Sequence, residues 1–313
     1  MFLVLIGLLL CFLPSAKLQA GDDASGELER RRGDRICLIG NTLAERMQHD
    51  GWLETLLQSR FPGHRLVFRN LGFSGDEVAR RQRSANFGSP DDHLARNRAD
   101  VIFAFFGFNE SFRGTRGLGE FQRDLDVFIR QTLEKKYNGE SAPRLVLFSP
   151  IAHEDLEDLD LPDGSENNER LRLYTLAMAK VTKAHGVRFV DLFAPSRDLY
   201  RKSSRPLTIN GIHLNEYGNR WIATVVERAL LPSQPATSRD SRHLEKLRDA
   251  VVDKNSYWFN RYRSTDGFNV FGGRSALKFT DDISNFDVLQ RRDGDPRRHD
   301  GQPRSSRLGS REG

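Results

Sequence analysis

The chain has 313 residues, a length that allows one large domain or two small ones. Hydrophobic residues make up 38% of it and charged residues 29%, and the mean hydropathy is −0.57, a composition typical of a soluble globular protein. The net charge of +5 is small and is spread along the chain without a concentrated basic block, so nothing in it indicates binding to nucleic acid.

The first residues predict export. Residues 2–14 are almost entirely apolar, and a small-residue cleavage site follows at 19–21. An apolar run this short is typical of a secretory signal and not of a membrane span. We therefore expect a signal peptide over 1–20, export to the periplasm or the extracellular space, and a polar linker over 21–33. Only the amine of Met1 precedes the run as a positive charge, so an uncleaved N-terminal anchor is the alternative.

The two cysteines give no basis for a disulfide in the mature chain. Cys11 lies within the predicted signal, which leaves Cys37 alone, without a disulfide partner or the companions of a cysteine metal site. Cys37 lies in an apolar run and is best explained as a small buried residue of a strand. The sequence has no Cys-x-x-Cys-His motif for attaching haem. We expect no metal and no other cofactor.

From residue 34 onward, apolar runs typical of β-strands alternate with segments of helical periodicity. The expected strands lie at 35–39, 66–69, 100–106, 144–148 and 187–192, and the expected helices at 43–61, 120–136, 166–185, 215–231 and 242–263. Over 34–231 this alternation predicts an α/β domain with a parallel sheet covered by helices on both faces. Sites in such sheets form outside the carboxyl ends of the strands.

Beyond the α/β domain, we expect a helical, aromatic-rich extension over 232–280 and a polar, disordered tail over 281–313. The helix of the extension carries Tyr257, Trp258 and Phe259. These rings are suited to stacking on a sugar, to contacting a partner domain or to packing against the core.

Three strand ends carry groups suited to stabilising a developing negative charge. The turn Gly-Asn-Thr-Leu at 40–43 places the hydroxyl of Thr42 at a helix N-terminus, where backbone N–H groups favour an oxyanion. After the next strand, Gly75 allows close approach of the backbone to a bound group. After the third strand, Asn109 can donate a side-chain N–H. Each has a simpler explanation by itself: a helix cap at Thr42, a glycine loop and an Asx turn.

A histidine completes the series. His213 lies directly before the last helix of the α/β domain, where it can serve as a general base. A single histidine is more often a surface residue. The order of the four groups along the chain is therefore more informative than any one of them.

Hydroxyl, glycine, asparagine and late histidine follow one another as in the four consensus blocks of the SGNH/GDSL hydrolases, and the chain resembles that family over 34–231. The resemblance implies a flavodoxin-like three-layer α/β/α sandwich with a five-stranded parallel sheet. It implies these roles: Thr42 as nucleophile, His213 as base, Asn210 in the position of the orienting acid, and Thr42, Gly75 and Asn109 as donors of the oxyanion hole.

The chain departs from the family pattern at several of these positions. Where the family has Gly-Asp-Ser-Leu, this chain has Asn41 for the aspartate and Thr42 for the serine. Asn210 replaces the aspartate before the histidine, and Glu110 replaces the aspartate that often follows the asparagine of the third block. The methyl group of threonine crowds the attack and restricts χ1. Asn210 provides no negative charge for a protonated His213, and the equivalent change in serine proteases lowers the rate about 10⁴-fold.

Other polar residues are possible members of the same pocket. His153 and Glu154 follow the fourth expected strand, while Asn41 and Glu110 lie beside the residues named above. His153 has no third ligand at a useful spacing, so we expect no metal site there.

Two functions remain open. One is an exported hydrolase that acts on ester bonds of a small molecule or glycan through a Thr42–His213 dyad; the family resemblance points to acylated carbohydrate. The other is a catalytically impaired pocket that is kept for binding. The stretch 255–263 also resembles the start of longer exported bacterial proteins, in which an SGNH module precedes a sugar-dehydrogenase-like propeller and a haem domain. On that hypothesis, the polar tail is a truncated or altered end.

Overall fold

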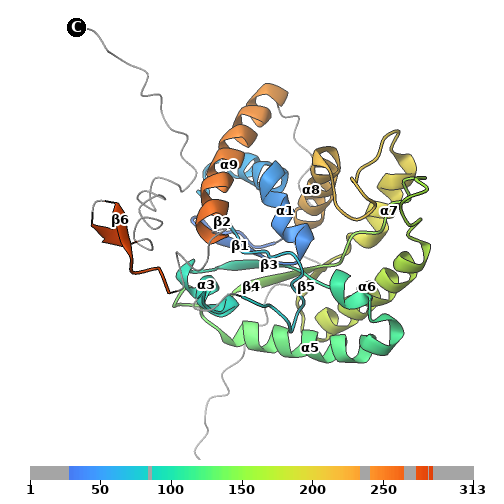
Figure 1. The fold of residues 1–313 in the computed structure, drawn as a ribbon, viewed down its shortest axis with the longest axis horizontal. Helices are drawn as coiled ribbons and strands as arrows, with labels where there is room; N and C mark the ends of the chain where they lie inside the picture. Colours follow the sequence, from blue (N-terminus) through green and yellow to red (C-terminus); the bar gives the residue numbers. More distant parts are fainter. Residues whose placement is uncertain (1–27, 84–86, 233–239, 264–272, 281, 285–313) are drawn as a thin grey trace, which may run out of the picture.

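Five parallel strands form the centre of the molecule. In the computed structural model, which describes residues 28–83, 87–232, 240–263, 273–280 and 282–284, the strands pair in the order β2-β1-β3-β4-β5 (Figure 1). Their bounds are Arg35–Gly40 (β1), Val67–Asn70 (β2), Val101–Phe105 (β3), Arg144–Phe148 (β4) and Arg188–Val190 (β5). All neighbouring pairs are parallel. The predicted flavodoxin-like α/β/α fold is confirmed.

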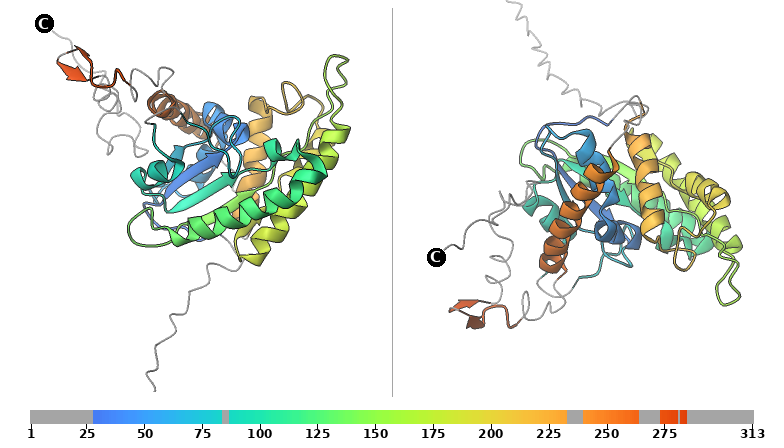
Figure 2. Two further views of the ribbon diagram at one scale, coloured as in Figure 1. Left: turned by 60° about the horizontal axis from the view of Figure 1, so that its bottom comes forward. Right: turned by 90° about the horizontal axis from the view of Figure 1, so that it is seen from above.

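Helices cover both faces of this sheet (Figure 2). One face carries α1 (Thr42–Asp50), α2 (Trp52–Arg60) and α8 (Glu216–Leu230), and the other carries α3 (Pro90–Arg96), α5 (Gly114–Glu134) and α6 (Ser165–Ala184). Two shorter helices, α4 (Phe108–Ser111) and α7 (Phe193–Lys202), follow β3 and β5. The sequence analysis did not foresee α3, α4 or α7.

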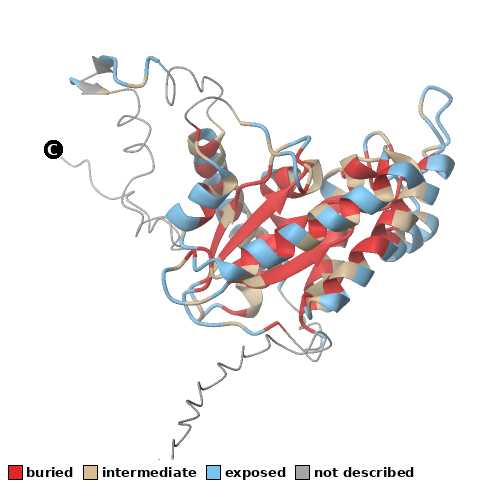
Figure 3. Ribbon diagram, turned by 90° about the horizontal axis from the view of Figure 1, so that it is seen from below, coloured by how far each residue is buried: buried red, intermediate tan, exposed pale blue. Residues whose placement is uncertain are grey.

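The two faces of the sheet have separate cores. On β1, Ile36 and Leu38 belong to the core beneath α1, α2 and α8, whereas Cys37 and Ile39 belong to the core beneath α5 and α6. This two-residue alternation is the geometry of a strand buried on both sides. Figure 3 shows the buried strands between helices whose outer surfaces are exposed.

The single helix expected over 43–61 is two helices. Gly51 ends α1 and precedes α2 with a φ of 68°, and its N–H donates to the carbonyl of Met47 at 3.0 Å. A Cβ atom at Gly51 would lie 3.0 Å from Val252 and 3.1 Å from Val251. Glycine therefore fits both the left-handed backbone and the close approach of a later helix.

That later helix is α9 (Ser241–Tyr262), and it covers the free edge of β2. The indole Nε1 of Trp258 donates to the carbonyl of Asn70 at 2.6 Å, and the hydroxyl of Tyr262 donates to the carbonyl of Leu71 at 3.2 Å. The rings of Trp258 and Tyr262 are stacked and buried in the core of the α/β domain. Covering an edge strand in this way blocks its pairing with another chain.

Of the alternatives for the aromatic run, packing against the core holds for Trp258, and contact with a partner domain stays a prediction. Trp258 lies within the same domain, and Phe259 makes an edge contact with His49 of α1. Of the three rings, Tyr257 is the most exposed, at 41%.

The remaining segments bear on the predicted ends of the chain. A short antiparallel hairpin joins β6 (Lys278–Thr280) to β7 (Ile283–Ser284), so the segment expected to be disordered from 281 begins inside it. The predicted signal over 1–20 and the rest of the tail lie outside the described residues. Within the part of the chain that the structure describes, no helix is both long and apolar enough to span a bilayer.

Candidate active site

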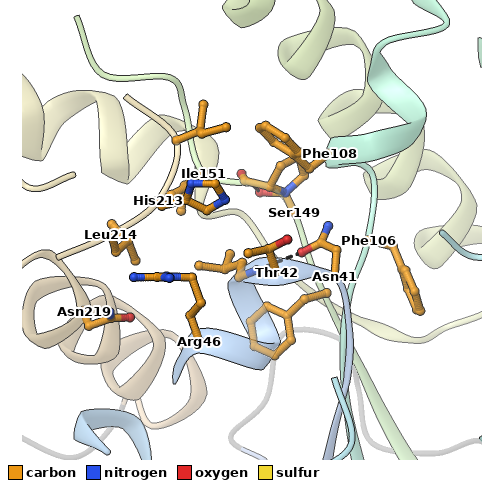
Figure 4. A pocket seen from close by; sticks show the side chains of 14 residues that line it. Asn41, Thr42, Arg46, Phe106, Phe108, Ser149, Ile151, His213, Leu214 and Asn219 are labelled. Carbon is orange, nitrogen blue, oxygen red and sulfur yellow. Dashed lines mark hydrogen bonds between the residues drawn. The ribbon is translucent and has the colours of Figure 1, made fainter. Parts of the chain in front are cut away.

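A pocket opens at the carboxyl ends of β1, β3 and β4, where the strand order changes direction (Figure 4). The turn after β1, the residues that follow β3 and β4, and the segment before α8 line it. Its empty space, counted out to the open mouth, is about 500 Å³. Thr42, His213 and Asn41 are among the lining residues.

Thr42 is the first residue of α1 and not its cap. The cap is Asn41, whose Oδ1 accepts a hydrogen bond from the backbone N–H of Leu43 at 3.1 Å. The turn is tight because Gly40 has a φ of 122° and a Cβ there would lie 2.0 Å from the carbonyl oxygen of Phe105. The Thr42 hydroxyl makes no hydrogen bond with any described residue, so a capping role does not explain this threonine.

His213 is oriented by Asn210. The Oδ1 atom of Asn210 lies 3.1 Å from the backbone nitrogen of His213 and 3.1 Å from its ring Nδ1. Because the backbone N–H is always a donor, the amide atom that faces it is the oxygen, and Nδ1 must then carry the ring proton. The other ring nitrogen, Nε2, is left as a proton acceptor.

The charge state of His213 also suits a base. Burial lowers its pKa from the usual value, and the positive charge of Arg46 lowers it further, whereas Glu45 acts in the opposite direction. Burial and the charge of Arg46 both favour the neutral imidazole. Thr42 and His213 line the same pocket without a direct hydrogen bond between them, and such contacts are often long until substrate is bound.

The two other expected oxyanion donors, Asn109 in α4 and Gly75 in the loop after β2, are not part of the pocket lining. The side chain of Asn109 donates from Nδ2 to the carbonyl of Asp76 at 3.0 Å, next to Gly75 in the chain. Gly75 has a φ of 86° and is exposed, and no atom lies within 4 Å of a Cβ built on it. Asn109 keeps a second amide hydrogen that this contact does not use.

The structure places Glu110 and His153 outside the lining. Glu110 is buried and accepts hydrogen bonds from the N–H groups of Val78 at 2.8 Å and Gly107 at 2.9 Å; burial raises its pKa to about 6. Glu110 therefore joins the segment after β2, which contains Val78, to the turn after β3, which contains Gly107, and it does not contact His213. His153 is buried against Gly211: a Cβ atom built on Gly211 would lie 2.4 Å from Nε2 of His153.

The sequence around this pocket matches the model of a known protein family. Residues 40–221 match the GDSL-like Lipase/Acylhydrolase family. The chain belongs to this family. Its class of activity is therefore ester hydrolysis, and the matched residues include all the sequence blocks described above.

Solved structures show the same fold at low sequence identity. A catalytic mutant of Axe2, an acetylxylan esterase from Geobacillus stearothermophilus, is 16% identical with a TM-score of 0.52, covering 67% of this chain and 99% of its own. A protein described as GDSL-like lipase from Parabacteroides merdae is 16% identical with a TM-score of 0.51, covering 66% and 99%. No curated protein matches the chain.

In this GDSL-family chain, a buried carboxylate supports the loop that carries the histidine. Glu154 accepts hydrogen bonds from the N–H groups of Leu207 at 3.0 Å and Thr208 at 2.7 Å, and from the Thr208 hydroxyl at 2.6 Å. Its own N–H donates to the carbonyl of Gly211 at 2.8 Å. The sequence analysis noted Glu154 only as a possible pocket residue, and no local pattern shows that it holds a loop more than fifty residues away.

The loop that contains Gly75 is held by two arginines. The guanidinium groups of Arg83 and Arg263 each lie 3.7 Å from the ring centroid of Phe73. Arg83 also forms a buried ion pair with Asp76 at 2.8 Å. Because Arg263 directly follows α9, the C-terminal extension helps to fix a loop beside the pocket.

Among the described residues, no group of three His, Cys, Asp or Glu side chains is placed to hold a metal ion. The residues that line the pocket present hydroxyl, imidazole, amide and guanidinium groups.

Proposed function

We propose that the pocket hydrolyses acyl esters, with Thr42 as the nucleophile and His213 as the general base. The observation that carries this proposal is the Asn210 contact. It sets the imidazole so that Nε2 is a proton acceptor in the pocket that also contains the unpartnered hydroxyl of Thr42.

In the first half of the reaction, the Thr42 oxygen attacks the ester carbonyl carbon while His213 Nε2 takes the hydroxyl proton. We assign stabilisation of the oxyanion to the N–H of Thr42 and, from the family resemblance, to the N–H of Gly75 and the amide of Asn109 beside the pocket. Collapse breaks the bond to the alcohol oxygen, which leaves with the proton from His213. Water then attacks the acyl-threonine, again through His213, and releases the carboxylic acid and the free hydroxyl.

Asn210 makes this a weaker system than one with an aspartate in its place. The backbone N–H of His213 holds the amide oxygen toward the ring, so the ring has the tautomer that catalysis needs. An amide oxygen does not neutralise the imidazolium that forms during attack. We infer that turnover is slow because no carboxylate neutralises the imidazolium of His213 as it forms.

Export and an acylated carbohydrate substrate are further parts of the proposal. The apolar run at 2–14 supports export. An acetylxylan esterase with the same fold supports the substrate class. The larger dehydrogenase-like protein is supported only by the resemblance at 255–263, a stretch that packs largely on its own domain. Transcript sequencing through the codon for Gly313 would find a propeller-coding region if that hypothesis is right.

The test is hydrolysis of short-chain 4-nitrophenyl esters by the purified chain. Wild type should turn over, Thr42→Ala and His213→Ala should fall to background, and Thr42→Ser should retain or exceed wild-type activity because serine lacks the crowding methyl group. Equal rates in wild type, Thr42→Ala and His213→Ala would favour the alternative, a pocket that only binds.

A further inference from the structure

The pocket contains a cation that forms no ion pair with any described acid. Arg46 lies one helical turn after Thr42 on α1, and its side chain lines the pocket (Figure 4). Its Nε atom is buried without a hydrogen-bond partner, and none of the described residues forms a hydrogen bond or ion pair with its guanidinium. Buried polar groups normally have partners, so this one requires an explanation.

The surroundings make the charge more effective. No aspartate or glutamate lines the pocket, and most of its other lining residues are apolar, among them Phe106, Phe108 and Ile151. An arginine in such surroundings pairs with an anion more strongly than it does in water.

The nearby acids have other partners. The carboxylate of Asp50, on the same helix, accepts a hydrogen bond from Asn219. Glu45 accepts a hydrogen bond from Ser74 at 2.7 Å and lies 3.5 Å from His49. Burial raises the pKa of Asp50, and the charge of Arg46 acts in the opposite direction, so the two groups interact at a distance. Neither acid forms an ion pair with Arg46, and neither lines the pocket.

The positive charge of Arg46 disfavours the protonated form of His213. Glu45 counters this effect only in part, and Asn210 has no negative charge to add. An anion paired with Arg46 would provide the negative charge that the site lacks when the imidazolium forms.

We propose that Arg46 binds an anionic group of the substrate, so that the preferred ester carries a carboxylate near the scissile bond. This inference rests on the proposed hydrolase function. The carboxylate can belong to the alcohol, as in an acylated acidic sugar, or to the acyl group, as in the half-ester of a dicarboxylic acid. Both present the same group to the guanidinium.

Two matched ester pairs distinguish these sources. The first is an acetylated methyl glucuronoside against the acetylated methyl glucoside, which differ by a carboxylate on the alcohol. The second is 4-nitrophenyl hydrogen adipate against its methyl ester, which differ by a carboxylate on the acyl group. One of the two pairs carries the carboxylate on the same side of the ester as the natural substrate. In that pair, kcat/KM should be at least about 10-fold higher for the anionic ester than for the neutral one, as expected for a charge-assisted hydrogen bond.

Arg46→Met should reduce that preference to about one, and Arg46→Lys should retain part of it. Arg123→Met, which removes the same charge from an exposed position on α5, is the control for net charge and should leave the preference intact. No preference in wild type for either anion, or a preference that Arg46→Met does not change, would overturn the inference.

Calorimetric binding of two unreactive anions, methyl glucuronoside and adipate, separates this result from failure of the hydrolase proposal. Binding of either that is lost in Arg46→Met supports the anion site even if no ester is hydrolysed. Hydrolysis of neutral esters, with no anion preference and no binding of either anion, keeps the proposed function and rejects the anion site.

Discussion

Replacing Asn210 with aspartate should make the enzyme faster. In the structure, Oδ1 of Asn210 already lies 3.1 Å from Nδ1 of His213, so the substitution adds charge without a new contact. A hydrogen bond to a charged group contributes about 1.5–3 kcal/mol and a neutral one about 0.5–1.5 kcal/mol. The difference of about 1–2 kcal/mol, applied to the imidazolium that forms during attack, corresponds to a gain of about 5- to 30-fold in kcat.

The substitution should also move the pH profile. A general base acts when unprotonated, so kcat/KM rises with pH through the pKa of His213 in the free enzyme. Burial and Arg46 hold this pKa below the usual value of 6.5, and the acid limb of wild type should therefore lie below pH 6.5. A carboxylate at position 210 favours the protonated ring, so Asn210→Asp should shift this limb to higher pH.

The assay is kcat and kcat/KM for a neutral short-chain ester from pH 4 to 9. Gln131→Glu is the control for added charge, since Gln131 is exposed on α5 and its side chain forms no hydrogen bond with any described residue. It adds the same charge without touching the imidazole or the segment that carries it. An unchanged rate and an unchanged acid limb in Asn210→Asp would refute the role assigned to Asn210.

Three further substitutions test the scaffold. Glu154→Gln should loosen the loop that carries the base, so that kcat falls about 10-fold while KM changes little; steady-state kinetics on a folded variant measures this split. Gly51→Ala should lower the unfolding free energy by more than the roughly 1–2 kcal/mol that left-handed backbone strain costs, because its Cβ also meets α9. Gly139→Ala should show the backbone strain alone, because no atom lies within 4 Å of a Cβ there. Urea denaturation of both variants measures the difference. Trp258→Phe should cost about 1–3 kcal/mol in the same assay by leaving the carbonyl of Asn70 unpaired, and a loss under 0.5 kcal/mol would contradict that role.

The sequence was sufficient to predict the sheet because its signal is local. Each buried strand is a short apolar run, and the run that contains Ile36 and Cys37 is recognisable without knowing what covers it. Thr42 could be named for a related reason, since it follows β1 and parallel strands bring their carboxyl ends to one edge, whereas His213 was named from its place in the order of the family blocks.

What the sequence could not show depends on contacts between distant segments. The break at Gly51 reflects close packing against α9, two hundred residues later. Glu154 is indistinguishable from a solvated acid until its three donors are seen. Arg46 looked like an ordinary helix residue, and only the fold shows that it faces the pocket without an acidic partner.

The claim that Thr42 forms the covalent bond to the acyl group can be tested by labelling. The purified chain is treated with a fluorophosphonate, which reacts with activated hydroxyl groups, and the modified peptide is located by mass spectrometry. The account predicts one adduct on Thr42, absent in Thr42→Ala and formed much more slowly in His213→Ala. An adduct on another residue, or none in a chain that hydrolyses esters, would contradict it.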